Sequence, residues 1–292
     1  MTVEELTESP SLGRLYATAV ATSRGRGGDT LPDLEVVLPG VTVDRDHLAA
    51  YDDVCGFRFG DVLPATYVHV LAFPLAVRVM TDRAFPFPLV GLVHVANRIE
   101  VRRPVEAGET LDLRVRAENL RAHPRGRQLD LVAEATVDGE PVWTGTSTYL
   151  RRGGRAPDGS GNREGRDDAG RDDAQPRQVA VWPVPGDTGR RYAAVSGDRN
   201  PIHLHPLAAR AFGFPRAIAH GMWTKARCLA AYEGRLPDAF TVDVDFRAPV
   251  LLPSRVAFST TTPLSAAGTR TEFALRDPKR GRRHLGGVLT PT

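Results

Sequence analysis

The stretch Tyr192-Ala-Ala-Val-Ser196-Gly197-Asp198-Arg-Asn200-Pro201-Ile-His203-Leu-His205-Pro206 gathers more polar, turn-forming and titratable residues than any other window of the chain. Ser-Gly-Asp and Asn-Pro favour turns, so Asp198 and His203 are expected on irregular backbone, five residues apart in sequence. A carboxylate and an imidazole on one rigid turn can hold a water molecule between them and share proton transfer. The stretch therefore predicts an acid–base site.

The same run continues through Gly213-Phe214-Pro215 to His220-Gly221-Met222. Together the two segments resemble the signature of the MaoC-like, R-specific enoyl-CoA hydratase (hydratase 2) family. That signature reads Tyr-x-x-x-Ser-Gly-Asp-x-Asn-Pro-Ile-His, followed by Gly-Phe and His-Gly-Met. The match is long and gapless. The resemblance implies a hot-dog fold, in which a curved antiparallel sheet wraps a central helix, and a hydro-lyase activity on acyl thioesters.

Length and composition agree with a soluble enzyme. The chain has 292 residues, enough for two ordinary domains, with 41% apolar and 25% charged residues. No apolar run approaches the roughly 20 residues that cross a bilayer, and the acidic N-terminus lacks the order of a secretory signal. Cys55 and Cys228 form neither a disulfide framework nor a zinc site. We therefore expect a cytoplasmic location and no integral membrane segment.

The charge pattern argues against nucleic-acid binding. The 38 basic and 35 acidic residues leave a net charge of +3, whereas nucleic-acid binding needs a clustered basic face. The arginines are scattered, and Lys225 and Lys279 are the lysines of the chain. A few arginines could pair with the phosphates of a coenzyme A ligand.

Sequence patterns predict two similar units. From Thr42 onward the first unit is expected to contain a helix over 47–54 with Asp46 as N-cap, then a helix over 67–80 that Pro74 kinks or shortens. Strands are expected over 89–105, 110–119, 128–137 and 141–150, with a hairpin at Asp138-Gly139. Residues 151–178 have almost no large apolar side chain and are predicted to be a disordered linker.

Three blocks then repeat in the same order. Residues 51–57 align with 192–198 at an offset of 141, 63–69 with 214–220 at 151, and 99–105 with 244–250 at 145. The sequence alone supports an α+β protein with tandem repeats. With the resemblance, it predicts a double hot dog: an N-terminal repeat over 1–150 and a C-terminal MaoC-like repeat over 179–292 that carries the active site.

The first repeat has lost the titratable pair. Phe57 stands in the place of Asp198, and Phe59 and Val62 stand in the places of Asn200 and His203. One active site per chain is therefore expected. The first repeat is predicted to be a structural partner and a wall of the acyl-binding tunnel, a division that the resemblance also implies.

The expected roles in the site follow from residue type and from the family pattern. An isolated turn aspartate usually caps the next segment, but His203 and Asn200 at the family's spacing favour a catalytic Asp198. Imidazole titrates near neutrality and can both take and give a proton, which makes His203 the second catalytic group. Asn200, Ser196 and Tyr192 are predicted to support the loop. Which of the catalytic pair is the stronger base stays open.

Gly221 is the predicted oxyanion site. It begins an apolar helical run over 222–232, and the first N–H groups of a helix have no internal partner. His220 is expected to be structural or to support the site. His203-Leu-His205 would point two imidazoles to one face of an extended segment and raises a metal site as an alternative, but no third ligand stands at metal-like spacing. We therefore predict no metal and no cofactor, and a rim position for His205.

The most consistent activity is reversible hydration of a trans-2-enoyl-CoA to the (3R)-3-hydroxyacyl-CoA; the stereochemistry is implied by the resemblance. Three alternatives remain: dehydration of acyl-carrier-protein thioesters in fatty-acid elongation, thioester hydrolysis by a hot-dog thioesterase, and non-catalytic acyl binding. The expected partner is an acyl-CoA or acyl-carrier-protein thioester, with a homodimer as a further expectation. Acyl chain length and physiological direction are not encoded in any pattern that we identified.

Overall fold

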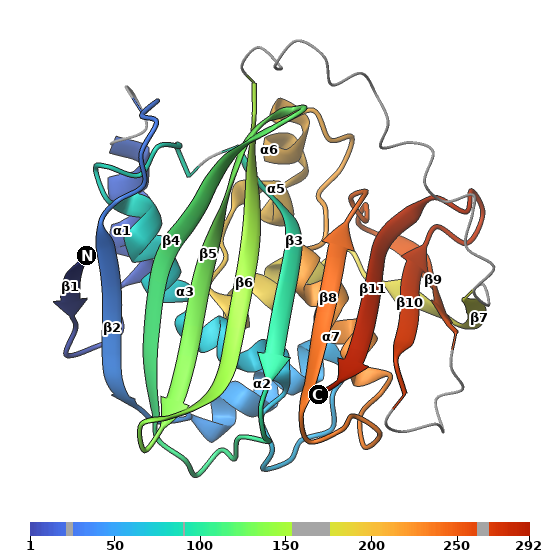
Figure 1. Ribbon diagram of the computed structural model, residues 1–292. Helices are drawn as coiled ribbons and strands as arrows, with labels where there is room; N and C mark the ends of the chain where they lie inside the picture. Colours follow the sequence, from blue (N-terminus) through green and yellow to red (C-terminus); the bar gives the residue numbers. More distant parts are fainter. Residues whose placement is uncertain (22–25, 90, 154–175, 262–268) are drawn as a thin grey trace.

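The computed structural model describes residues 1–21, 26–89, 91–153, 176–261 and 269–292, and its centre is one continuous sheet (Figure 1). The described strands are β1 (Thr2–Glu5), β2 (Leu34–Val41), β3 (Leu92–Val101), β4 (Leu111–His123), β5 (Gly126–Val137), β6 (Glu140–Arg152), β7 (Arg177–Val184), β8 (Phe240–Phe246), β9 (Ser254–Thr260), β10 (Thr271–Arg276) and β11 (Arg283–Pro291).

The strand order identifies the tandem hot-dog fold. The 11-stranded sheet runs β1-β2-β4-β5-β6-β3-β8-β11-β10-β9-β7. Leaving aside β1, which pairs in parallel with β2, the order of the first half is the mirror of the order of the second. β3 and β8 pair antiparallel at the seam, with Ile99 opposite Val242. The predicted α+β double hot dog is confirmed.

The helices lie behind this sheet (Figure 1). They are α1 (Leu12–Ala21), α2 (Arg45–Cys55), α3 (Ala65–Thr81), α4 (Thr188–Ser196), α5 (Pro201–Leu204), α6 (Pro206–Ala211) and α7 (Gly221–Ala230). The central helix of the first half is α3, and that of the second half is α7. None of the helices in the described parts of the chain is long and apolar enough to cross a membrane.

The central helix α3 continues through Pro74, which was expected to kink or shorten it. Proline removes one helical hydrogen bond, but α3 is apolar almost throughout, and most of its side chains are buried against the sheet. Burial of this apolar surface outweighs the one missing bond.

Two helix ends show how the repeats correspond. Both α2 and α4 end in a left-handed glycine, Gly56 at φ 81° and Gly197 at φ 72°. Phe57 therefore follows its glycine as Asp198 follows Gly197. The N-cap of α2 is Asp44, whose side chain accepts from the Asp46 and His47 N–H groups; the prediction of Asp46 was wrong by two residues.

The middle block of the sequence repeat was aligned wrongly. Leu63 N–H donates to Val105 O at 2.8 Å just before α3, and Ala219 N–H donates to Val250 O at 2.9 Å just before α7. These equivalent contacts give an offset of 156 in place of 151. The residue equivalent to Gly221 is therefore Ala65, because both begin their helices. Val62 bridges Glu106 as Ile218 bridges Leu251, so Val62 corresponds to Ile218, and the prediction that it stands in the place of His203 was wrong.

The elements β1, α1 and β2 precede those expected from Thr42 onward and lie within the range of 1–150 given to the first repeat. The ends of the linker differ from prediction. At the expected linker, Arg151 and Arg152 end β6, while Arg177 and Gln178 begin β7. The interior of that linker, 154–175, lies outside the described residues.

A buried lysine fastens the seam between the repeats. Lys225 on α7 is 0% exposed. Its ammonium donates to Asn97 O at 3.1 Å and Asn97 Oδ1 at 2.6 Å on β3, and to Val242 O at 3.1 Å on β8. These three acceptors match the three N–H groups of one ammonium.

Replacing Lys225 by Met should therefore weaken the fold. Methionine keeps most of the side-chain volume but leaves buried oxygens without a donor, and we expect a loss of roughly 3 kcal/mol in the free energy of unfolding. Urea unfolding followed by circular dichroism measures it. Lys279→Met, at the exposed lysine, is the matched control; equal midpoints for the two variants would contradict the role of Lys225.

Candidate active site

The loop after α4 presents Asp198 to the interior. Gly197 turns the chain in its left-handed conformation. The Asp198 N–H donates to Ser196 Oγ at 3.2 Å, and Asp198 Oδ1 accepts from the Asn200 N–H at 3.2 Å. The carboxylate is therefore held by the loop that carries it.

His203 lies on the short helix α5, whereas irregular backbone was predicted for it. Asn200 is the N-cap of α5, with Oδ1 accepting from Ile202 N–H at 3.4 Å, and Pro201 is its first residue. His203 Nδ1 lies 2.8 Å from Ile218 O. Because a carbonyl oxygen only accepts, Nδ1 carries the proton, and Nε2 of the neutral ring is left as an acceptor.

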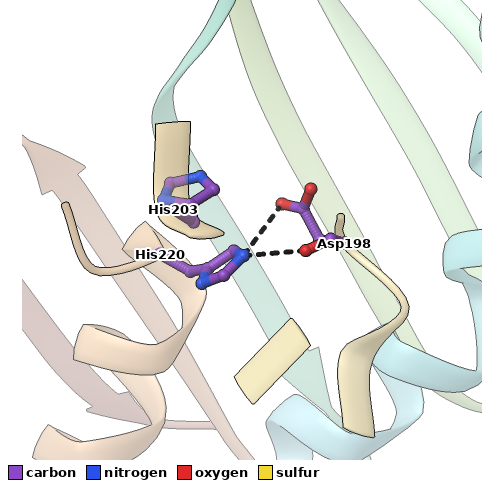
Figure 2. Close-up of side chains that lie close together, drawn as sticks. All are labelled: Asp198, His203 and His220. Atoms are coloured by element: carbon purple, nitrogen blue, oxygen red, sulfur yellow. Dashed lines mark hydrogen bonds and ion pairs between the residues drawn. The ribbon is translucent and has the colours of Figure 1, made fainter. Parts of the chain in front are cut away.

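His220 is the third member of the cluster (Figure 2). Its ring is 2% exposed and stacks on that of His203 with 3.7 Å between centroids. Nε2 donates to the backbone oxygen of Asp198 at 2.9 Å and lies 3.8 Å from Asp198 Oδ2. Sequence reasoning named His220 only as structural or supporting, whereas it contacts the candidate catalytic residue directly.

The cluster holds one ionised acid beside two neutral imidazoles. Burial would raise the pKa of Asp198, but His220, His203 and the Asn200 N–H outweigh burial and hold the pKa below that of an ordinary aspartate. Burial lowers the pKa of His203, against the opposing effect of Asp198. Burial and the neighbouring His203 lower the pKa of His220 to about 3. At neutral pH the net charge of the cluster is negative.

Asp198, His203 and His220 also have the composition of a metal site. Their potential ligand atoms lie within 4.8 Å of one another, so a third ligand exists that the sequence spacing did not show. The His220 nitrogen on this side carries the proton donated to Asp198 O, so the arrangement as it stands is a hydrogen-bond network. His205 is exposed and follows the short helix α5, so it does not share an extended segment with His203 as the metal alternative supposed.

Gly221 opens α7 beside this cluster. Its N–H is at the first helical position and has no recorded acceptor within the described residues. A side chain here would meet the Phe246 ring at 3.1 Å. A side chain at this position would therefore need the Phe246 ring to shift, and Gly221 itself lines the cavity.

These groups share one cavity of about 920 Å³. Besides Asp198, His203, His220 and Gly221, its lining side chains come from both repeats and include Tyr16, Ala19, His69, Phe73, Met80, Leu89, His94, Tyr149, Tyr192, Arg199, Phe246, Arg247 and His284. In contrast, Phe57 stacks on Tyr51 at 6.3 Å, and Phe59 and Val62 are 61% and 56% exposed. None of these last three lines the cavity.

Sequence reasoning missed the contact that Tyr16 of the N-terminal repeat makes with the active-site loop. Tyr16 on α1 donates to Gly197 O at 3.3 Å and accepts from Arg199 N–H at 3.3 Å, so it braces the loop from 181 residues away. Tyr192 packs its ring at 4.9 Å from His220, and its buried hydroxyl has no partner. No local pattern around Tyr16 could have indicated this contact.

Comparison with known proteins places the chain. The profile of the MaoC like domain matches residues 168–274. 3-Hydroxyacyl-thioester dehydratase X of Mycobacterium tuberculosis is 37% identical over 261 residues, which is 89% of this chain and 90% of that protein.

Solved structures agree. The crystal structure of HtdX of Mycobacterium tuberculosis matches with a TM-score of 0.76 and 36% identity over 88% of this chain and all of that one. A MaoC-like dehydratase from Phytophthora capsici, at 19% identity and a TM-score of 0.68 over 88% and 95% of the two chains, shows the shared fold. The chain belongs to the MaoC-like dehydratase family.

Proposed function

We propose that this protein is a hydro-lyase that reversibly adds water across the trans-2 double bond of an enoyl thioester to give the (3R)-3-hydroxyacyl thioester. The observation that carries the proposal is the convergence of Asp198, His203 and the Gly221 N–H on one cavity. A carboxylate and an imidazole activate water, and a helix N-terminus stabilises an enolate. The names of the curated relatives, which include a 3-hydroxyacyl-thioester dehydratase and an enoyl-CoA hydratase, support it.

The reacting water lies between the Asp198 carboxylate and His203 Nε2. Both groups are in proton-accepting forms, and of the two free side chains imidazole is the stronger base. His203 therefore takes the proton as the water oxygen attacks C3, and Asp198 orients the water and stabilises the imidazolium. His203 then gives this proton to C2 on the same face. The OH of the water ends on C3 and its other hydrogen ends on C2, so the step balances.

Gly221 acts on the thioester. Negative charge gathers on the thioester oxygen as C3 is attacked, and the N–H at the start of α7 donates to it. The positive end of the helix dipole adds to this stabilisation. The thioester itself is the electron sink, so the step uses only groups of this chain and the substrate.

The N-terminal repeat forms the acyl arm of the cavity. His69, Phe73 and Met80 line it along α3, which rises about 16 Å between the first and last of these residues. Such a path exceeds the length of a four-carbon acyl group. The exposed Arg199 and Arg247, which also line the cavity, suit the phosphates of coenzyme A or of a carrier protein's phosphopantetheine.

Thioester hydrolysis has weaker support. Ser196 Oγ is buried and accepts from the Asp198 N–H, so it is not presented as a nucleophile. A cytoplasmic location is also part of the proposal, supported by the two unpaired, buried thiols of Cys55 and Cys228, which are typical of reducing compartments.

Asp198→Asn and His203→Ala should each lower kcat/KM for crotonyl-CoA hydration by about 10²- to 10⁴-fold, because each removes a proton-transfer group. Loss of absorbance at the conjugated double bond measures turnover, and circular dichroism checks folding. Asp187→Asn and His205→Ala are matched controls at exposed positions. Near-normal rates in folded Asp198→Asn or His203→Ala would end the assignment, and release of free thiol by the wild type would indicate hydrolysis instead.

Gly221→Ala keeps the backbone N–H but should lower kcat for the same reaction by about 10-fold or more, because its methyl group shifts that N–H away from the thioester oxygen and a lost oxyanion donor typically costs at least this much. The added methyl group meets the Phe246 ring and displaces either the ring or the helix N-terminus. Steady-state kinetics separate kcat from KM. A raised KM with an unchanged kcat would mean that Gly221 serves binding alone.

The acid limb of kcat/KM should lie below pH 6.5. Hydration needs Asp198 ionised and His203 neutral, and the pKa of each lies below that of the free side chain. Activity is therefore fully present at neutral pH and is lost only as pH falls through these lowered values. A pH series with enoyl-CoA well below KM tests this, and a midpoint at or above 6.5 would contradict it.

A further inference from the structure

The acyl arm of the cavity contains a polar wall next to the reacting groups. It consists of His69 on α3, His94 on β3 and Tyr149 on β6, all of which line the cavity. The His94 ring stacks on Tyr149 at 4.7 Å and on His69 at 6.4 Å. An arm that held only an alkyl chain would have no use for three polar side chains in contact.

Each member has unused hydrogen-bonding capacity. His94 Nε2 is buried without any partner. Within the described residues the His69 ring and the Tyr149 hydroxyl also have no recorded hydrogen bond. Leaving such groups unpaired beneath a bound ligand costs affinity, so the wall points to a ligand that pairs with them.

A local irregularity of the sheet presents His94 to the cavity. The β3–β6 register shifts between His94 and Ala96, with His94 opposite Tyr149 and Ala96 opposite Thr148. Bulges of this kind re-aim side chains near active sites. The Ala96 backbone favours a proton on the His94 ring. Because Nε2 has no partner, that proton lies on the other nitrogen, and Nε2 of the neutral ring is an acceptor.

The wall is close to the reacting carbons. His94 lies 5.0 Å from the Phe246 ring, and Phe246 is the ring that packs against Gly221. Asp198 exerts an electrostatic effect on His69, His94 and Tyr149. A group bound by the wall therefore sits a few carbons beyond the double bond.

We infer that this wall binds a hydroxyl group of the acyl chain, and that the preferred substrates are acyl thioesters hydroxylated beyond C3. The hydroxyl donates to His94 Nε2 and accepts from Tyr149, while His69 backs the His94 ring. The inference rests on the proposed hydratase function and adds a specificity that the reaction itself does not require.

The test compares trans-2-octenoyl-CoA with octenoyl-CoAs that carry one hydroxyl at carbon 5, 6 or 7. We expect at least one hydroxylated substrate to exceed the plain one in kcat/KM by about tenfold, since a buried polar site discriminates against a partner that lacks the hydroxyl. His94→Phe and Tyr149→Phe keep the stacked rings and remove the polar atoms, so each should bring the ratio toward one. His205→Phe, at an exposed histidine, is the matched control and should keep the wild-type ratio.

Turnover of plain octenoyl-CoA with no preference for any hydroxylated substrate overturns this inference alone, because it shows that water or nothing occupies the wall. A preference that survives in both folded variants also overturns it. Where a variant does not fold, the wild-type ratio still decides. Absence of turnover with every enoyl thioester overturns the proposed function and this inference with it.

Discussion

The antiparallel pairing of β3 with β8 is the contact on which the site depends. It joins the two repeats into one sheet, and Lys225 ties α7 to both strands from below. Gly221 begins α7, and His94 lies on β3, so the seam fixes their separation. A slip of one residue at the seam would reverse the faces of β3 and remove His94 from the cavity.

Duplication followed by divergence accounts for the asymmetry of the molecule. The sheet order is the same when read from either end, yet α3 has 17 residues and α7 has 10. The longer helix belongs to the repeat that lost its acid and imidazole, and it lines the arm that leads away from Asp198. One repeat thus carries the Asp198, His203 and His220 cluster, while the other contributes the longer central helix to the cavity wall. Neither repeat forms the cavity without the other, because residues of both repeats line it.

The sequence predicted the parts of the site that are adjacent in the chain. Asp198, Asn200 and His203 belong to one turn and one short helix, and turn chemistry with the family spacing indicated their grouping. Helix and strand ranges of the first repeat were also close, including the Asp138-Gly139 turn, where both residues have positive φ. Contacts across the fold were inaccessible: nothing near Tyr16 or His94 in sequence reveals that tertiary packing brings them to the same cavity. The predicted offset of 151 between the middle blocks of the two repeats was wrong for a related reason. It aligned similar residue types, whereas the equivalent helix starts are five residues further apart in the sequence.

The electrostatics of the cavity explain why so many imidazoles can be buried together. Burial lowers the pKa of His69 to about 4 and that of His94 to about 3, so both rings are neutral at physiological pH and add no repulsion. Of the cluster and the wall, Asp198 is the group that is ionised, and the polar groups around it replace the water that it loses. A second buried cation here would raise the cost of His203 becoming imidazolium during the reaction. Keeping the wall neutral therefore preserves the one proton carrier that hydration needs, and it lets the same wall offer hydrogen bonds without disturbing the acid–base pair.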